Sequence, residues 1–118
     1  MLVRRPLNAA VIQGSAVTFD CSSNVSTDSI QWYNSLCVTG RSVSDCRSDM
    51  IYSYTLNNVP STFSVTPVNN DTHKTRDLNI NPTQLTDAGV YLCAERRPGV
   101  GITDSNSAQL IVLGNIYF

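Results

Sequence analysis

The nine residues Leu85–Cys93 constrain the fold of this chain more than any other stretch. From Gly89 onward, small, aromatic and sulfur-bearing residues alternate with aliphatic ones, and this period of two predicts a half-buried β-strand. Just ahead, Asp87 and Gly89 have turn chemistry, because an Asp side chain bonds its own backbone and Gly tolerates a sharp bend. Tyr91 stands two residues before Cys93, directly after this corner. Its phenol can therefore reach back to a buried backbone group while its ring packs inside.

Two features upstream fit the same interior. Val17–Cys21 is another alternating run that ends in a cysteine, and Ile30–Tyr33 carries Trp32, the only tryptophan. Six residues at these spacings resemble the immunoglobulin superfamily: Cys21, Trp32, Asp87, Gly89, Tyr91 and Cys93. The run Ala108–Gly114 also resembles the joining-segment end of antigen-receptor variable domains.

The resemblance implies an all-β fold, an immunoglobulin V-type β-sandwich of two antiparallel sheets with Greek-key topology. Roughly sixty residues separate Trp32 from Cys93, which leaves room for the extra strands of the nine-stranded variable type. We expect one V-set domain over residues 1–114, with 115–118 as a tail or linker. Pro6 is the expected break where the first strand passes from one sheet to the other.

The remaining strands are expected over short alternating runs, with a single helical turn within Pro82–Asp87. These runs are Leu7–Ile12, Ser15–Cys21, Ile30–Ser35, Met50–Tyr52, Ser61–Val65, Asp77–Asn81, Gly89–Glu95 and Ala108–Gly114. A polar turn is expected over Val68–Thr75.

Four cysteines in a short chain allow three disulfide connectivities. The resemblance implies the pair Cys21–Cys93 in the core, which leaves Cys37–Cys46 as a second, local bond. That second bond, which would close a turn-rich insertion, departs from the family pattern, since members generally lack a cystine at this place.

Two further departures concern contacts that the family commonly uses. An Arg often pairs with the residue that corresponds to Asp87, but Thr62 stands in its place here. The sequence leaves open whether Asp87 is unpaired or uses Lys74 or Arg76. Variable domains also carry an aromatic residue and Gly-x-Gly before the last strand, where this chain has Asp104–Ser107, so a bulge there is in question.

Composition and motifs argue against catalysis and against nucleic-acid binding. Charged residues make up only 14% and the net charge is −1, so no general attraction to nucleic acid is indicated. His73 is the only histidine and has no nucleophile pattern around it, and no Cys-x-x-Cys motif is present. We predict a non-catalytic protein without cofactor or metal.

Recognition is expected instead at three loops that the fold brings to one end: Ser22–Ser29, Ser53–Asn58 and Glu95–Asn106. The last is the longest and has the most varied chemistry, because arginines fork to carboxylates or stack on aromatic rings and aliphatic residues add apolar contact. The residues predicted to bind ligand are Arg96, Arg97, Val100, Ile102 and Asp104.

A second surface is the outer face of the sheet expected to hold Ile30–Ser35, Met50–Tyr52, Gly89–Glu95 and Ala108–Gly114. A solvated face should be polar at outward positions, but four outward residues are apolar or aromatic: Tyr33, Val90, Leu92 and Ile111. A patch of this kind indicates a partner. We predict a homodimer or a heterodimer of two V domains through this face.

Cysteine content favours an oxidising compartment, either secretion or the extracellular side of the plasma membrane. Asn24 and Asn70 begin glycosylation sequons, which agree with that location. No leader or membrane span occurs within the sequence, so we expect a fragment that starts at an added Met1 and whose anchor lies elsewhere.

The resemblance therefore implies a recognition domain of an immune-type receptor, with an antigen, a glycan or a cell-surface protein as ligand. Two other classes stay open. One is a homophilic adhesion module that uses the sheet face, and the other is a soluble innate-immune lectin-like domain. Sequence diversity among sibling transcripts within Glu95–Asn106 would favour antigen recognition, whereas uniformity would favour adhesion.

Overall fold

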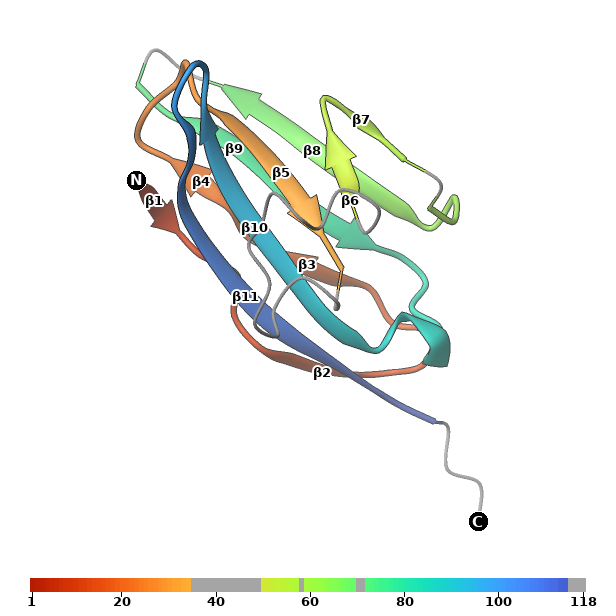
Figure 1. Cartoon of the computed structure of the whole chain (residues 1–118). Coiled ribbons are helices and arrows are strands. Elements are labelled where there is room, and N and C mark those ends of the chain that lie inside the picture. The colour runs from red at the N-terminus through yellow and green to blue at the C-terminus, as the bar shows by residue number, and fades with distance from the viewer. Residues whose placement is uncertain (35–49, 58, 70–71, 115–118) are drawn as a thin grey trace.

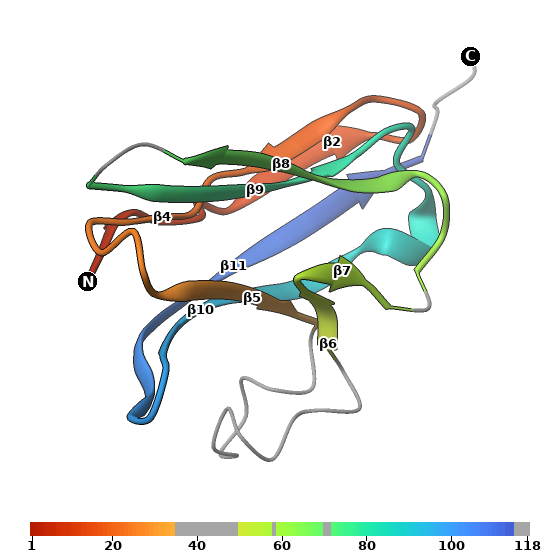
Figure 2. The same cartoon turned by 90° about the horizontal axis from the view of Figure 1, so that it is seen from above.

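The computed structural model of the chain describes residues 1–34, 50–57, 59–69 and 72–114. Two β-sheets lie face to face with their strands roughly aligned, and β1 and the end of β11 lie at opposite ends of the sandwich (Figures 1 and 2). The predicted all-β sandwich is confirmed. The predicted tail over 115–118 and the predicted Cys37–Cys46 bond lie outside the described residues.

Each sheet collects strands from distant parts of the chain. The first contains, in spatial order, β1 (Leu2–Arg4), β4 (Ser22–Ser23), β9 (Lys74–Ile80) and β3 (Val17–Phe19), with β8 (Phe63–Asn69) also paired to β9. The second contains β2 (Ala9–Ile12), β11 (Gly101–Leu113), β10 (Gly89–Arg97), β5 (Ser29–Tyr33), β6 (Met50–Ser53) and β7 (Thr55–Leu56).

The first strand is split between the sheets, as Pro6 predicts. β1 pairs antiparallel with β4 in the first sheet, while β2 pairs parallel with β11 in the second. Because proline has no amide hydrogen to give to a ladder, the chain leaves one sheet and joins the other around this residue.

The core lies between the sheets and is centred on the Cys21–Cys93 disulfide, which is fully buried. Trp32 is also fully buried, and its indole nitrogen donates a hydrogen bond of 2.7 Å to the carbonyl of Arg76 on the facing sheet. The ring of Phe19 stacks on that of Tyr91 with centroids 5.4 Å apart. The pattern of alternate inward residues therefore places its sulfur and aromatic groups together, as predicted.

The expected helical turn is present as η3 (Leu85–Asp87). The Asp87 carboxylate accepts a hydrogen bond of 2.8 Å from the backbone N–H of Gln84, which caps this turn. Within the described ranges no cation pairs with Asp87, so neither Lys74 nor Arg76 replaces the missing arginine. Thr62, at the position of that arginine, has a buried hydroxyl without a hydrogen-bond partner among the residues that the structure describes.

The predicted loop Glu95–Asn106 is wrong for most of its length. β10 continues to Arg97 and β11 begins at Gly101, so only the hairpin turn between them is irregular. The cause is tertiary: β10 and β11 pair from Gly89 opposite Leu110 as far as Arg97 opposite Gly101, with one register shift between Glu95 and Arg96. Local polarity and glycines predict a loop, but they do not reveal hydrogen bonding to a neighbouring strand.

Three smaller expectations also change. The register of this hairpin shifts between Glu95 and Arg96, so an irregularity of the bulge kind exists, but at Thr103 rather than within Asp104–Ser107. Part of the expected loop after Met50–Tyr52 is the short strand β7. The turn predicted over Val68–Thr75 is narrower, because β8 and β9 pair as far as Asn69 and Lys74.

Candidate functional site

An open hollow of about 460 Å³ lies on the outer face of the second sheet, near the end of the sandwich that carries the β10–β11 hairpin turn. It is lined by Gln31, Met50, Ser53, Tyr54 and Arg96. Gln31 pairs with Ser53 across β5 and β6, and Arg96 pairs with Ser29 across β10 and β5. Three adjacent strands thus place these side chains around one space.

The base of the hollow is held in place by hydrogen bonds. The Gln31 amide donates to the Ser53 hydroxyl at 3.1 Å and accepts from the Tyr33 hydroxyl at 2.7 Å. Gln31 is 5% exposed and Tyr33 only 2%. Because both ends of the amide are used, the floor of the hollow is rigid and presents a fixed shape to a ligand.

Arg96 and its neighbour Arg97 have different environments. The Arg97 guanidinium pairs with the carboxylate of Asp28, with N–O distances of 3.3 and 3.4 Å. Asp28 is fully buried, so this arginine neutralises an internal charge. The Arg96 guanidinium is half-buried at the hollow and has no hydrogen bond or ion pair within the described ranges. Of the two predicted binding arginines, only Arg96 is available to a ligand.

Tyr54 forms one side of the hollow in an unusual backbone conformation. It stands between β6 and β7 with φ at 66° and is 76% exposed. A bulky residue in the left-handed region is uncommon and costs about 1–2 kcal/mol. No sequence signal marks this position, since the usual Gly or Asn is absent. Ser53 and Tyr54 both belong to Ser53–Asn58, one of the three loops predicted for recognition. Gln31 and Met50 were missed because their juxtaposition with these residues depends on strand register.

The other three predicted binding residues differ in how free they are to contact a ligand. Val100 is 69% exposed at the turn of the hairpin and is free to make apolar contact. Ile102 packs on the outer-face cluster of Tyr33 and Leu92. Asp104 holds the N-terminal strand, since its carboxylate accepts from Arg5 at 2.8 Å and from the amide of Leu2 at 3.0 Å.

These contacts change the pKa of the Asp104 carboxyl. Burial acts most strongly and would raise its pKa, but hydrogen bonds from Leu2 and Arg5 and the charge of Arg5 outweigh it, so the pKa lies below its ordinary value. Asp104 is therefore a structural anion.

Two of the four residues predicted for the dimer face are buried in the single domain. Tyr33 is 2% exposed and Leu92 is 5% exposed, and with Ala94 they form a small cluster of their own. Val90 is half-buried, and Ile111 is 46% exposed. Outward direction in a strand therefore does not ensure solvent contact.

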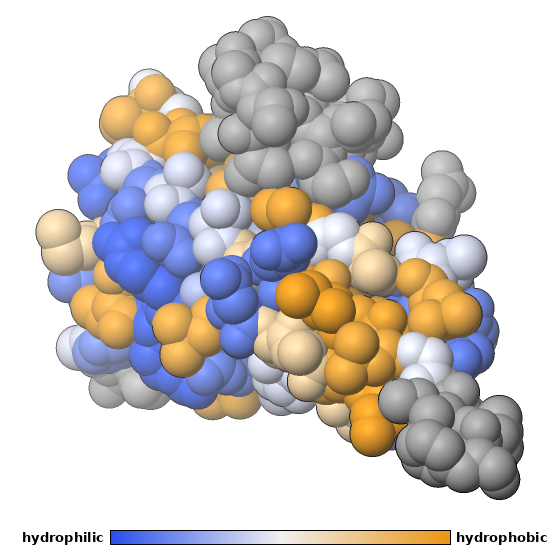
Figure 3. All heavy atoms as spheres, turned by 90° about the horizontal axis from the view of Figure 1, so that it is seen from below, coloured by the Kyte–Doolittle hydropathy of each residue, from blue (hydrophilic) through white to orange (hydrophobic). Residues whose placement is uncertain are grey.

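Exposed apolar residues gather instead beside Ile111. Parallel pairing of β2 with β11 places Ala10 next to Ile111 and Ile12 next to Leu113. Ile12 and Leu113 are 56% and 52% exposed. We call these four residues the β2–β11 patch. Figure 3 shows hydrophobic residues gathered on the side of the molecule where β2 and the end of β11 lie.

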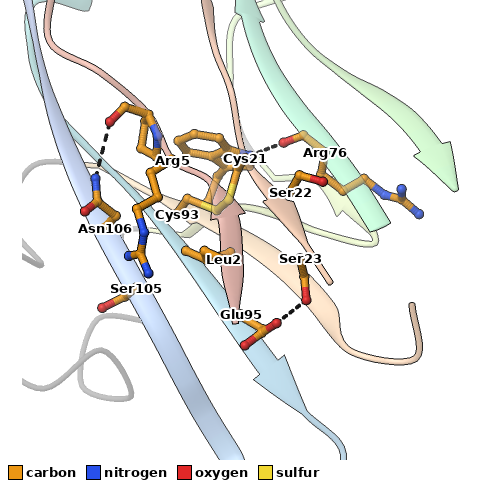
Figure 4. The surroundings of a disulfide bond; sticks show 12 residues. Leu2, Arg5, Cys21, Ser22, Ser23, Arg76, Cys93, Glu95, Ser105 and Asn106 are labelled. Atoms are coloured by element: carbon orange, nitrogen blue, oxygen red, sulfur yellow. Dashed lines mark hydrogen bonds between the residues drawn. A yellow bond between two sulfur atoms is a disulfide. The ribbon is translucent and has the colours of Figure 1, made fainter. Parts of the chain in front are cut away.

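A buried acidic group lies between the sheets on the hairpin side of the disulfide (Figure 4). The fully buried Glu95 carboxylate accepts hydrogen bonds from the hydroxyl of Ser23, from the hydroxyl of Thr103 at 2.6 Å and from the ammonium of Met1 at 2.8 Å. Burial is the largest influence and raises its pKa, but these donors together lower the pKa below its ordinary value. Because its carboxylate already accepts from these three donors, Glu95 has a structural role.

Comparison with known proteins identifies the family. The family model described as the immunoglobulin V-set domain matches residues 5–113. The chain is a member of this family. Domains of the V-set family are generally non-catalytic binding modules, and they are typically extracellular or secreted. No curated protein sequence matches this V-set domain.

Solved structures support the fold of the V-set domain. The first immunoglobulin domain of RIG-5, determined as a homodimer, superposes with a TM-score of 0.68 at 18% identity, covering 95% of each chain. Chimeric titin Z1Z2 with an exogenous decorin peptide superposes with a TM-score of 0.63 at 15% identity, covering 98% of this chain and 94% of the other. A structure of three titin immunoglobulin domains gives 0.66 at 23% identity, covering 97% and 32%.

Three remaining features of the V-set domain bear on function. Among the described residues, no group of three or more His, Cys, Asp or Glu side chains could hold a metal ion. In the same part of the chain no helix is long and apolar enough to cross a membrane. Asn24, a predicted glycosylation site, is exposed, whereas Asn70 lies outside the described residues.

Proposed function

We propose that this V-set domain is the non-catalytic recognition module of a secreted or cell-surface immune-type receptor. It binds a protein ligand at the end of the sandwich where the β10–β11 hairpin, the segment around Asp28 and the β6–β7 turn lie. The observation that carries this proposal is the hollow beside Arg96, whose floor is held by hydrogen bonds and whose cation has no acidic partner in the described part of the chain. A hollow with a few convergent polar groups is the usual form of a binding site.

Two ion pairs hold the segments at the proposed ligand-binding end in place. The Arg97–Asp28 ion pair ties the hairpin to the neighbouring segment, and Asp104 ties the start of β11 to the N-terminal strand. Recognition surfaces gain affinity when they are ordered before binding, because less entropy is lost.

A panel of purified extracellular proteins tests this function. The V-set domain, linked into a multimer so that weak binding is detected, is applied to the panel. Each binder is then tested with the Val100→Asp variant of the domain, which changes only the exposed turn of the hairpin. We expect at least one binder whose signal falls with Val100→Asp and is unchanged by Arg4→Gln at a remote surface ion pair. A panel without binders, or binders that are indifferent to Val100→Asp, would contradict the proposal.

We further propose that the domain self-associates through the second sheet, with the β2–β11 patch in place of Tyr33 and Leu92. The support is the exposure of Ile12, Ile111 and Leu113 on adjacent strands. Ile111→Arg is the informative variant, because it charges an exposed position and leaves the core intact. Sedimentation velocity at micromolar concentration should show a dimer that Ile111→Arg dissociates. A strict monomer before substitution would rule this out.

A further inference from the structure

We propose that the hollow lined by Gln31, Met50, Ser53, Tyr54 and Arg96 binds a carboxylate side chain of a protein partner, with the Arg96 guanidinium as its anchor. This inference rests on the proposed function and names the chemistry of the same site. The five residues enclose about 460 Å³, enough for an acidic side chain and its neighbouring backbone.

The charge balance around the hollow favours an anion. Two other cations at this end are matched by carboxylates: Arg97 pairs with Asp28, and Arg5 pairs with Asp104. Arg96 has no such partner within the described ranges. A half-buried guanidinium without an acceptor has lost part of its hydration and gains from a bidentate carboxylate.

The cations nearby act in the same direction. Tyr54 also borders a smaller hollow lined by Lys74 and Arg76. Burial and, after it, the charge of Arg76 lower the pKa of Lys74 below its ordinary value. The charge of Asp28 acts in the opposite direction on Lys74, so the positive charge that Lys74 and Arg76 add near Tyr54 is partly balanced.

The remaining walls select a side chain rather than a bare ion. Met50 supplies an apolar surface, and Tyr54 an exposed aromatic ring, so the methylene groups of a glutamate have a place to pack. Ser53 already receives the Gln31 amide, which leaves its own hydroxyl hydrogen to donate. The donor set of guanidinium and hydroxyl matches the acceptor-only chemistry of a carboxylate.

The backbone of Tyr54 is a second, independent observation. An aromatic residue stands at a left-handed position where Asn or Gly would lie without strain. Strain of this kind tends to occur where function requires a particular side chain. Here it holds an exposed ring beside an unpaired cation.

NMR titration with small blocked amino acids tests this directly. Acetyl-glutamate methylamide is titrated to millimolar concentration into the ¹⁵N-labelled domain, and acetyl-glutamine methylamide serves as the matched neutral probe. We expect shifts in the Arg96 side-chain Nε–H and in the amides of Ser53 and Tyr54. The neutral probe should bind at least about tenfold more weakly, as expected for loss of one charge-assisted hydrogen bond.

Three variants complete the test. Arg96→Gln should weaken the glutamate probe about tenfold or more, Arg96→Lys should retain part of the affinity because the charge stays, and Arg4→Gln should change nothing. Arg4→Gln also removes one positive charge, but from a surface ion pair elsewhere. Dispersed spectra confirm that each variant is folded.

The inference is overturned if the glutamate and glutamine probes bind alike, or if Arg96→Gln leaves the titration unchanged. It is also overturned if glucuronate shifts the site and the glutamate probe does not, since the carboxylate would then come from a glycan. Loss of the inference leaves the proposed function intact when panel binders still respond to Val100→Asp. An empty panel would contradict the proposed function, even if the probe binds.

Discussion

The hydroxyl of Tyr91 donates a hydrogen bond of 2.5 Å to the backbone carbonyl of Asp87. This contact closes the corner between η3 and β10 and satisfies a carbonyl that would otherwise be buried without a partner. Burial, and after it the charge of Asp87, raises the pKa of the Tyr91 phenol above its ordinary value. The hydroxyl therefore remains a donor across the neutral range.

Tyr91→Phe should lower the free energy of unfolding by about 1–3 kcal/mol, because it deletes this donor and leaves the Asp87 carbonyl unpaired. Chemical denaturation measures the change. Tyr54→Phe removes an exposed hydroxyl and is the matched control, with an expected change within about 0.5 kcal/mol. Equal stability of the two variants would show that the corner bond is dispensable.

Acidification should destabilise the domain. The pKa of Glu95 and that of Asp104 are lower in the folded state than their ordinary values. Such groups contribute stability above the unfolded-state pKa, and this contribution is lost as pH falls through that value toward the folded-state pKa. Unfolding free energies measured from pH 6 to pH 3 should therefore decline.

Glu95→Gln should make that decline shallower and should cost about 1–3 kcal/mol at pH 7. The reason is chemical: Ser23 and Thr103 both donate to the carboxylate, whereas a glutamine turns an N–H toward one of them. An unchanged pH profile in Glu95→Gln would show that other carboxylates govern acid unfolding.

Thr62→Val should stabilise the domain by about 1 kcal/mol, because the Thr62 hydroxyl is buried without a partner and valine has the same shape. Thermal unfolding measures the gain. Thr103→Val is the contrasting substitution, since its hydroxyl donates to Glu95 at 2.6 Å and its removal should destabilise. If both variants lose stability, the Thr62 hydroxyl has a partner in solution.

Tyr54→Asn should raise the free energy of unfolding by about 0.5–1 kcal/mol, since asparagine adopts the left-handed region more readily. Tyr54→Ala keeps the unfavourable conformation and should be close to neutral. Binding of the glutamate probe should weaken in both variants, because both remove the ring. A destabilised Tyr54→Asn would indicate that the tyrosine side chain supports the turn and is not kept for a ligand.

The local patterns of this sequence predicted the sandwich well. Leu85–Cys93 specifies a turn, a strand and an inward tyrosine from neighbouring residues alone, and the structure confirms each of them. Pro6 likewise predicted the split of the first strand, because the absence of an amide hydrogen is a property of the residue itself.

What the amino-acid order alone determined here is the period of each strand, the corner at Tyr91 and the residues that can form the core. What only the tertiary structure decided is which side chains are free to bind. Arg96 and Arg97 are adjacent and chemically identical, but β10 turns them to opposite faces, and only Arg97 finds a buried carboxylate, on Asp28. Periodicity is set within a few residues. Availability depends on partners that lie 69 positions away in the chain.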